Sequence, residues 1–140
     1  MLSLTRRYRF CASHRLHSTS LNEEENRALY GKCNNPWGHG HDYVLEVIVR
    51  GPVDPGSGQV VNIGALDRLV EQTVIGPLDH RSLNQDVPAF AGTVPTSENL
   101  VREIEQQLLR AWPSAFSHSP AVLAGIRLRE TKRNHFETLR

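Results

Sequence analysis

Two histidines separated by one residue, His39 and His41, stand directly before a run in which apolar and polar residues alternate. The alternation predicts a β-strand from about His41 to Val49, and residues two apart in a strand project from the same face. Both imidazoles can therefore reach one ion without distortion of the backbone. The glycines at positions 38 and 40 leave room for a ligand or another stretch of backbone to come close.

A second alternating segment, residues 2–14, ends in a third histidine, His14, on its apolar face. If this strand pairs with the strand that follows His39 and His41, the three imidazoles meet at one end of the sheet. Three neutral imidazoles with an open fourth position are the donor set of a catalytic zinc. Taken singly, His14 also fits a buried core histidine and the other two a polar turn, but the three together favour a metal site.

The next elements are a short helix and a hairpin. Residues 18–31 are expected to contain a helix capped by Asn22 or Ser20, with acidic residues in its first turn and Gly31 at its end. The stretch 51–58 is rich in Gly and Pro and predicts a turn. After it, the valines at 60 and 61 are expected to form a short strand that pairs with the second strand.

Two amphipathic helices and a last strand complete the pattern. One helix is predicted from Ile63 to about Val74, stopped at 76–77 by Gly-Pro, and the other from 95–98 to Pro113. Between them, residues 78–95 form a long loop, which in a compact domain is usually functional. The last strand spans Ala121 to Thr131. One of its faces is expected to carry Val122, Ala124, Ile126, Leu128 and Glu130. The whole is α+β: a four-stranded antiparallel sheet with two helices on one face.

Length and composition narrow the class of protein. The 140 residues form one expected domain, 1–140, and the formal net charge of +1 favours no nucleic-acid partner. No apolar run approaches the ~20 residues of a membrane helix, and the N-terminus has no signal-peptide core. The two cysteines, Cys11 and Cys33, lack CxxC spacing. We therefore expect a soluble cytoplasmic protein with free thiols and no membrane association.

Cys33 lies six residues before His39 in a polar turn. It is open to three interpretations: a buried apolar thiol, a fourth zinc ligand, or a reacting group. The neighbouring Lys32 is expected to lower the pKa of the thiol, which favours acid–base or nucleophilic chemistry. Cys11, in the middle of the first strand, is expected to be a buried structural thiol.

Carboxylates supply the remaining candidate groups. Asp79 next to His80 can fix an imidazole tautomer and make a proton relay, although such pairs are common on surfaces. Glu130 ends the apolar face of the last strand, where an unpaired charge is costly. It is expected either to form an ion pair with Arg127 or Arg129, or to accept two N–H donors from a guanidine-like ligand edge. Five basic residues are further candidates for a phosphate chain, each also explicable as solvated charge: Arg15, Arg27, Lys32, Lys132 and Arg133.

Six short motifs, in order over nearly the whole chain, resemble the 6-pyruvoyl-tetrahydropterin synthase family. The resemblance implies the tunnelling fold (T-fold), in which the sheets of three subunits close into a barrel and two trimers stack into a hexamer. The active site lies between subunits. The motifs are Phe10-Cys11-Ala12-Ser13-His14-Arg15-Leu16, Gly31-Lys32-Cys33-Asn34-Asn35-Pro36, Gly38-His39-Gly40-His41, Pro77-Leu78-Asp79-His80, Pro95-Thr96-Ser97-Glu98-Asn99 and Glu130-Thr131.

The same resemblance implies the site and the reaction. Zn²⁺ is held by His14, His39 and His41, one ion per subunit. Cys33 accepts a proton and Asp79 with His80 completes the relay, while Glu130 anchors the pterin beside Thr96 and Ser97. The implied reaction converts 7,8-dihydroneopterin triphosphate to 6-pyruvoyl-tetrahydropterin in tetrahydrobiopterin biosynthesis, releasing triphosphate with Mg²⁺ assisting.

Four alternatives remain open. A sister activity, 6-carboxytetrahydropterin synthase of the queuosine pathway, shares the catalytic set, although the five residues between Cys33 and His39 resemble the pyruvoyl type. A related lyase activity, which cleaves the substrate's side chain to an aldehyde, would give a third product besides the pyruvoyl and carboxy compounds. The chain also fits a non-catalytic pterin- or zinc-binding module, or a structural zinc site with Cys33 as fourth ligand. Trp37, Asp42 and the ending 131–140 depart from the family pattern.

Overall fold

One mixed β-sheet runs the length of the molecule. The structure is a computed structural model that describes all 140 residues. Its sheet has five strands in the order β3-β1-β2-β4-β5. All neighbours are antiparallel except β3, which pairs with β1 in parallel over two residues. The strands are β1 (Leu2–His14), β2 (His39–Gly51), β3 (Arg81–Ser82), β4 (Val122–Arg129) and β5 (His135–Leu139).

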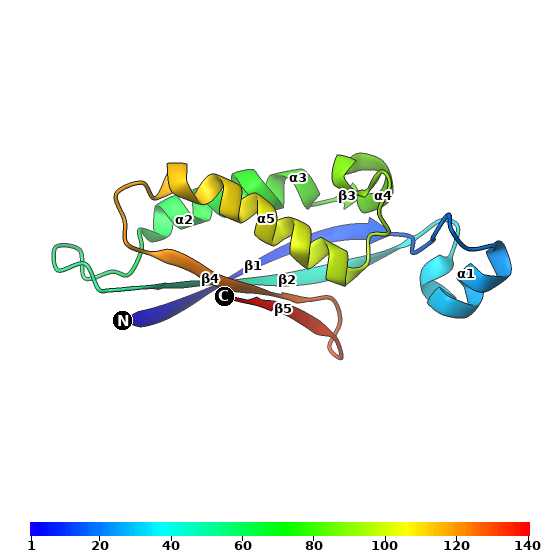
Figure 1. Cartoon of the computed structure of the whole chain (residues 1–140), viewed down its shortest axis with the longest axis horizontal. Coiled ribbons are helices and arrows are strands. Elements are labelled where there is room, and N and C mark those ends of the chain that lie inside the picture. The colour runs from blue at the N-terminus through cyan, green and yellow to red at the C-terminus, as the bar shows by residue number, and fades with distance from the viewer.

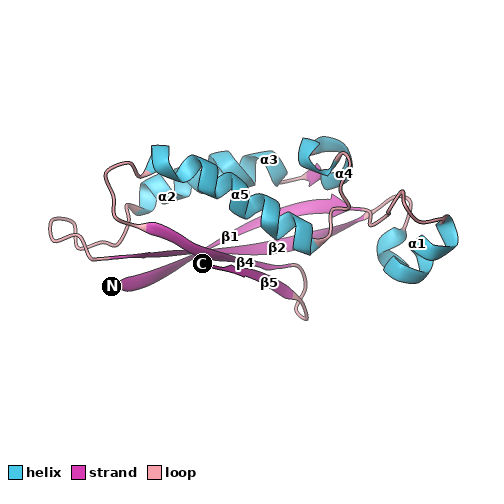
Figure 2. Cartoon of the chain, in the orientation of Figure 1, coloured by secondary structure: helices cyan, strands magenta, loops and turns pink.

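The helices form a second layer on one face of the sheet (Figures 1 and 2). The longest is α5, which runs beside α2 over the strands, while α1 lies beyond the end of the sheet where β1 stops. The other sheet face carries no helix in the single chain. None of the helices has both the length and the apolarity that a membrane span needs. The helices are α1 (Glu23–Tyr30), α2 (Ile63–Val70), α3 (Gly76–Leu78), α4 (Leu83–Asp86) and α5 (Ser97–Ala115), with 3₁₀ turns at Gly31–Asn34 and Pro88–Phe90.

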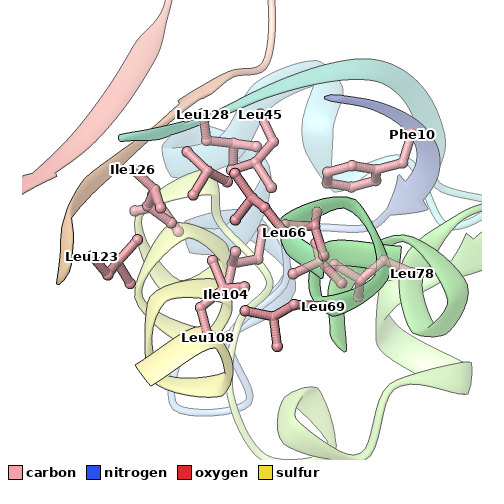
Figure 3. Close-up of a cluster of buried hydrophobic side chains, with 14 of the residues drawn as sticks. Phe10, Leu45, Leu66, Leu69, Leu78, Ile104, Leu108, Leu123, Ile126 and Leu128 are labelled. Carbon is pink, nitrogen blue, oxygen red and sulfur yellow. The ribbon is translucent and has the colours of Figure 1, made fainter. Parts of the chain in front are cut away.

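The core lies between the sheet and α2 with α5 (Figure 3). Leu45 and Leu128 point from the sheet toward Leu66 of α2 and Leu108 of α5, and all four are fully buried. Each such side chain contributes about 1.5–3 kcal/mol by leaving water. The two layers therefore hold the strands, and the histidines at their ends, in a fixed register.

The first two strands pair over their entire length. Leu2 faces Gly51 at one end and His14 faces His39 at the other. The expected extent of β1 is confirmed, and β2 extends two residues beyond the predicted run at each end. α1 also begins as expected, since the Asn22 side chain accepts from Glu25 N–H at 2.8 Å.

Four expectations about the elements were wrong. Val60 and Val61 form no strand, so the predicted hairpin does not exist. Gly76-Pro77 does not stop the helix. A π turn at Glu71–Ile75 shifts the hydrogen-bonding register, so Pro77, which has no N–H to donate, does not break the helix, and the chain stays helical to Leu78. Pro113 is likewise inside α5, which continues to Ala115. The long loop 78–95 contains β3, α4 and a 3₁₀ turn.

The sheet is five-stranded and mixed, which corrects the four-stranded antiparallel prediction. β5 and the two-residue β3 carry too short a pattern to be recognised in the sequence. In β4 a bulge near Ala124 changes the side-chain phase, because Leu123 and Gly125 pair with consecutive residues of β2. Leu123 is therefore buried and Val122 exposed, the reverse of the prediction, whereas Ile126 and Leu128 face the core as expected.

We predict that Gly125→Ala destabilises the sheet. A Cβ at this position would lie 2.3 Å from the Thr138 carbonyl oxygen of β5, so the two strands must separate. The expected loss is about 1–3 kcal/mol of unfolding free energy, measured by urea denaturation. Gly92→Ala, where nothing lies within 4 Å, is the matched control and should stay within about 0.5 kcal/mol of the parent chain. Equal stability of the two variants would contradict this account of the β4–β5 contact.

Candidate metal and pterin site

Three imidazoles converge where β1 ends and β2 begins. The ligand atoms of His14, His39 and His41 all lie within 4.8 Å of one another. The ring centroids are 4.7–4.9 Å apart and the ring planes are nearly perpendicular in every pair. The structure therefore confirms the prediction that the three side chains meet at one end of the sheet.

Hydrogen bonding fixes how the imidazoles present their nitrogens. His14 Nδ1 lies 2.9 Å from the Pro95 carbonyl, so this nitrogen carries the proton and Nε2 is left as an acceptor. His14 Nε2 and His39 Nδ1 are both buried with no hydrogen-bond partner. His39 Nε2 and His41 Nε2 face each other at 2.9 Å. The cluster thus holds unpaired nitrogen atoms in a place shielded from water.

Burial favours the neutral form of His14 and of His41. Burial lowers the pKa of His14 to about 4. The hydrogen bond to Pro95 raises this pKa, and the neighbouring imidazoles lower it further. Burial also lowers the pKa of His41. A neutral imidazole is the form that ligates metal. Three imidazoles within reach of one point fit Zn²⁺, and an ion bound there would give His14 Nε2 the partner that it otherwise lacks.

Cys33 lies beside the cluster but outside it. Its thiol is not among the mutually close ligand atoms, and its backbone carbonyl accepts from Leu16 N–H at 2.8 Å, two residues after His14. Burial, followed by the charge of Glu130, raises the pKa of the thiol. The expected lowering by Lys32 was wrong, because Lys32 is exposed to solvent while Glu130 is the charge that reaches the sulfur.

Glu130 follows β4 directly and reaches the first turn of α5. Its carboxylate accepts a hydrogen bond from the hydroxyl of Ser97, which is only 2 % exposed. The expected ion pair with Arg127 does not form, since Arg127 pairs with Glu46 and Glu137 instead. Thr96 is the N-cap of α5, its hydroxyl accepting from Asn99 N–H at 3.2 Å.

The sequence analysis did not identify Tyr43, whose buried hydroxyl lies close to this site. It sits among the apolar residues of β2, stacked on Phe10 at 5.0 Å, and is fully buried. Yet its hydroxyl has no hydrogen-bond partner. Burial and then the charge of Glu130 raise its pKa, with smaller effects of Ser97 and Cys33. A tyrosine two residues after a ligating histidine on the same strand face was the available signal.

Asp79 and His80 lie apart from this group, clustered with Cys11 at the edge of β1 that pairs with β3. The His80 Nδ1 atom is 3.1 Å from an Asp79 oxygen, as a relay requires, but the His80 side chain is 80 % exposed. The pair is held against Cys11, whose N–H donates to Asp79 at 2.8 Å and whose carbonyl accepts from His80 N–H at 2.6 Å. Cys11 itself is exposed and donates to Asp42, so the expectation of a buried thiol was wrong.

The sequence matches the family described as 6-pyruvoyl tetrahydropterin synthase over residues 3–139. The chain belongs to this family. A 6-pyruvoyl tetrahydrobiopterin synthase of Poecilia reticulata is 46% identical over 131 residues, which is 94% of this chain and 85% of that protein. The fold matches the structure of Caenorhabditis elegans 6-pyruvoyl tetrahydropterin synthase with a TM-score of 0.88 and 39% identity, covering 99% of this chain and 94% of the other.

A 6-carboxy-5,6,7,8-tetrahydropterin synthase of Rickettsia bellii is 25% identical over 146 residues, covering 94% of this chain and 95% of that protein. The chain is therefore much more similar to the pyruvoyl relative than to this carboxy one. The resemblance based on the motifs is confirmed at the level of the family.

We predict that the protein binds one Zn²⁺ per chain through three histidines and no sulfur. His14→Ala, His39→Ala or His41→Ala should weaken zinc binding by at least about 10–100-fold, the cost known for losing even an indirect metal contact. Cys33→Ala should retain it, as should His118→Ala, an exposed control outside the cluster. Chelator competition measures the affinities. In the Co²⁺-substituted protein, a sulfur-to-metal charge-transfer band would contradict this donor set.

Proposed function

We propose that this chain is a zinc-dependent 6-pyruvoyl-tetrahydropterin synthase that releases triphosphate from 7,8-dihydroneopterin triphosphate. The observation that carries the proposal is the convergence of His14, His39 and His41 beside Glu130 and Cys33, in a member of this synthase family. The site combines an acceptor for a pterin ring, three metal ligands and a thiol. A purely structural zinc site has no use for the Glu130 acceptor, and the Cys33 thiol is not among the mutually close ligand atoms.

Glu130 and its neighbours are placed to bind the ring. The 2-amino group and ring N–H of a pterin form a donor edge that matches a carboxylate in a two-point contact. The Ser97 hydroxyl already donates to one carboxylate oxygen, which fixes the orientation of Glu130. Ser97 is buried and Thr96 caps the same helix, so the anchor rests on the rigid end of α5.

We assign proton transfer at the substrate's side chain to Cys33. When bound, Zn²⁺ supplies Lewis-acid polarisation of the substrate hydroxyls and thereby acidifies the adjacent C–H. Cys33 then takes the carbon-bound proton, and protons return to the ring as it is reduced. The substrate's own side chain is oxidised to the same extent as its ring is reduced, so no external oxidant is needed. The only group released is triphosphate. Burial and the charge of Glu130 raise the pKa of Cys33, so the free thiol is protonated, and it passes its proton to the proposed Asp79–His80 relay before it takes the carbon-bound one.

The Asp79–His80 relay is proposed to reach Cys33 of another subunit. Within one chain the pair clusters with Cys11 and not with the three histidines, and His80 is mostly exposed. The sheet also has unpaired edges: β3 covers only Ala12 and Ser13 of β1, and β5 has no outer neighbour. Exposed strand edges recruit other strands. Pairing of these edges would close three sheets into a barrel, and two such trimers would form the expected hexamer.

Activity with the triphosphate substrate tests the proposal. Cys33→Ala should lower the rate of triphosphate release by about 10²–10⁴-fold, the usual contribution of a positioned acid or base. It should leave zinc content and pterin binding unchanged, which serves as the control. Mass spectrometry of the product distinguishes the 6-pyruvoyl compound from a carboxy or aldehyde-releasing outcome. Tight pterin binding without triphosphate release would instead identify a non-catalytic module.

Mixing two inactive variants tests whether the relay is shared between subunits. Cys33→Ala and His80→Ala chains are refolded together, so that random assembly should regenerate up to about a quarter of the sites. Each restored site takes Cys33 from one chain and His80 from its neighbour. Refolding each variant alone is the control and should give no recovery. If the mixture stays inactive although mixed oligomers form, both residues act within one chain.

A further inference from the structure

A second group of metal-ligating side chains lies where β1 pairs with β2 and β3. The ligand atoms of Cys11, Asp79 and His80 lie within 4.8 Å of one another, the same limit that holds for the three histidines of the first site. Asp42 faces Cys11 in the β1–β2 register, and the Cys11 thiol donates to its carboxylate at 2.8 Å. We propose that these four residues, which we call the Cys11 cluster, bind a second divalent cation of the Zn²⁺ class.

The donor atoms of the Cys11 cluster suit Zn²⁺ in type and in spacing. A thiolate, an imidazole and carboxylates are zinc ligands, whereas Mg²⁺ and Ca²⁺ take oxygen ligands. Two ligands on one tetrahedral Zn²⁺ stand about 3–4 Å apart. An Asp79 oxygen and His80 Nδ1 are 3.1 Å apart, and Cys11 Sγ and an Asp42 oxygen are 2.8 Å apart. An ion among these atoms would replace the two hydrogen bonds, and the Cys11 proton would pass to water.

Backbone contacts hold the Cys11 cluster together without an ion. Cys11 N–H donates to Asp79 at 2.8 Å, and the Cys11 carbonyl accepts from His80 N–H at 2.6 Å. His80 is also the one non-glycine residue with a positive φ, +60°. This conformation is uncommon outside glycine, and it turns the chain sharply beside β1. The ligands therefore stand close together already, so little further ordering of the chain is needed when an ion binds.

A surface cavity of about 370 Å³ gives an ion access to the Cys11 cluster. Cys11, Asp42 and His80 line this cavity, and Arg81 is its one arginine or lysine. Neither Asp42 nor Asp79 forms an ion pair with an arginine or lysine. The two carboxylates outweigh the single guanidinium, so the charge around the cavity favours a cation.

An ion in the Cys11 cluster would occupy the imidazole on which the proposed proton relay depends. His80 bound to a metal has no free nitrogen to exchange with Asp79, so the second ion should inhibit turnover. This inhibitory role rests on the proposed function. The binding of the ion does not, because it follows from the four donor groups alone.

Cobalt binding to the intact protein, loaded first with one equivalent of Zn²⁺, tests the site. The Zn²⁺ fills the buried histidines, and Co²⁺, which such sites bind less tightly, leaves it in place. Further Co²⁺ should then produce a sulfur-to-cobalt charge-transfer band. Cys11→Ser keeps a hydroxyl donor for Asp42 but should abolish the band. Asp42→Asn should weaken Co²⁺ binding by at least about tenfold, and Arg81→Gln should strengthen it.

Two controls show which groups hold the second ion. Cys33→Ala removes the other thiol, and Glu71→Gln removes an exposed carboxylate outside the cluster, so both should bind Co²⁺ as the parent chain does. Absence of the band in the parent chain would overturn the inference. So would a band that survives in Cys11→Ser, or one that is lost in Cys33→Ala.

Kinetics separate the metal site from the proposed function. Zinc beyond one equivalent should slow turnover of the pterin triphosphate by the parent chain. Cys11→Ser should resist this inhibition and keep the parent rate at one equivalent. Equal inhibition of the two chains would reject the inhibitory role. A parent chain that shows the Cys11-dependent band but no turnover would retain the metal site and reject the synthase assignment.

Discussion

The site depends on the antiparallel pairing of β1 with β2, which ends with His14 opposite His39. A shift of one residue in this register would turn either His14 or the 39–41 pair to the wrong face. Gly38 secures that end: its φ of +74° makes the turn into β2, and a Cβ there would lie 3.0 Å from the His14 carbonyl oxygen. The close approach of two backbones is thus what allows three imidazoles to meet.

Around the histidine cluster the fold buries polar atoms that have no hydrogen-bond partner, which is unfavourable for stability. His14 Nε2, His39 Nδ1 and the Tyr43 hydroxyl are all buried without partners in a chain whose core is otherwise apolar and well packed. An unpaired buried polar atom costs about 1–3 kcal/mol. Gathering three of them within one small region is difficult to explain by stability. An unpartnered His14 Nε2 is expected where a protein keeps a position ready for a metal, and an unpartnered Tyr43 hydroxyl where it keeps one for a polar ligand.

Much of this could be predicted from residue patterns, and the failures have physical causes. The alternation in β1 and β2 and the histidine spacing predicted the cluster, because strand geometry has a fixed period. Hydrophobic pattern could not reveal the bulge at Ala124 or the π turn before Pro77, since both shift the phase inside a continuous element. The pKa of Cys33 depends on Glu130, about a hundred residues away in sequence, and only tertiary structure shows that the charge near the thiol is negative.

The proposed catalytic groups are divided between the two faces of the sheet. The imidazoles, Cys33 and Glu130 lie on the helix-covered side, while Asp79 and His80 are held on Cys11, whose side chain belongs to the other side. Strand alternation makes this unavoidable, because Cys11 and Ala12 point in opposite directions. The His80 imidazole accordingly groups with Cys11 and Asp79, not with Cys33 of its own chain. We propose that a neighbouring subunit, paired along the unpaired edges of the sheet, presents its exposed His80 to Cys33, so that assembly and proton transfer would depend on the same strands.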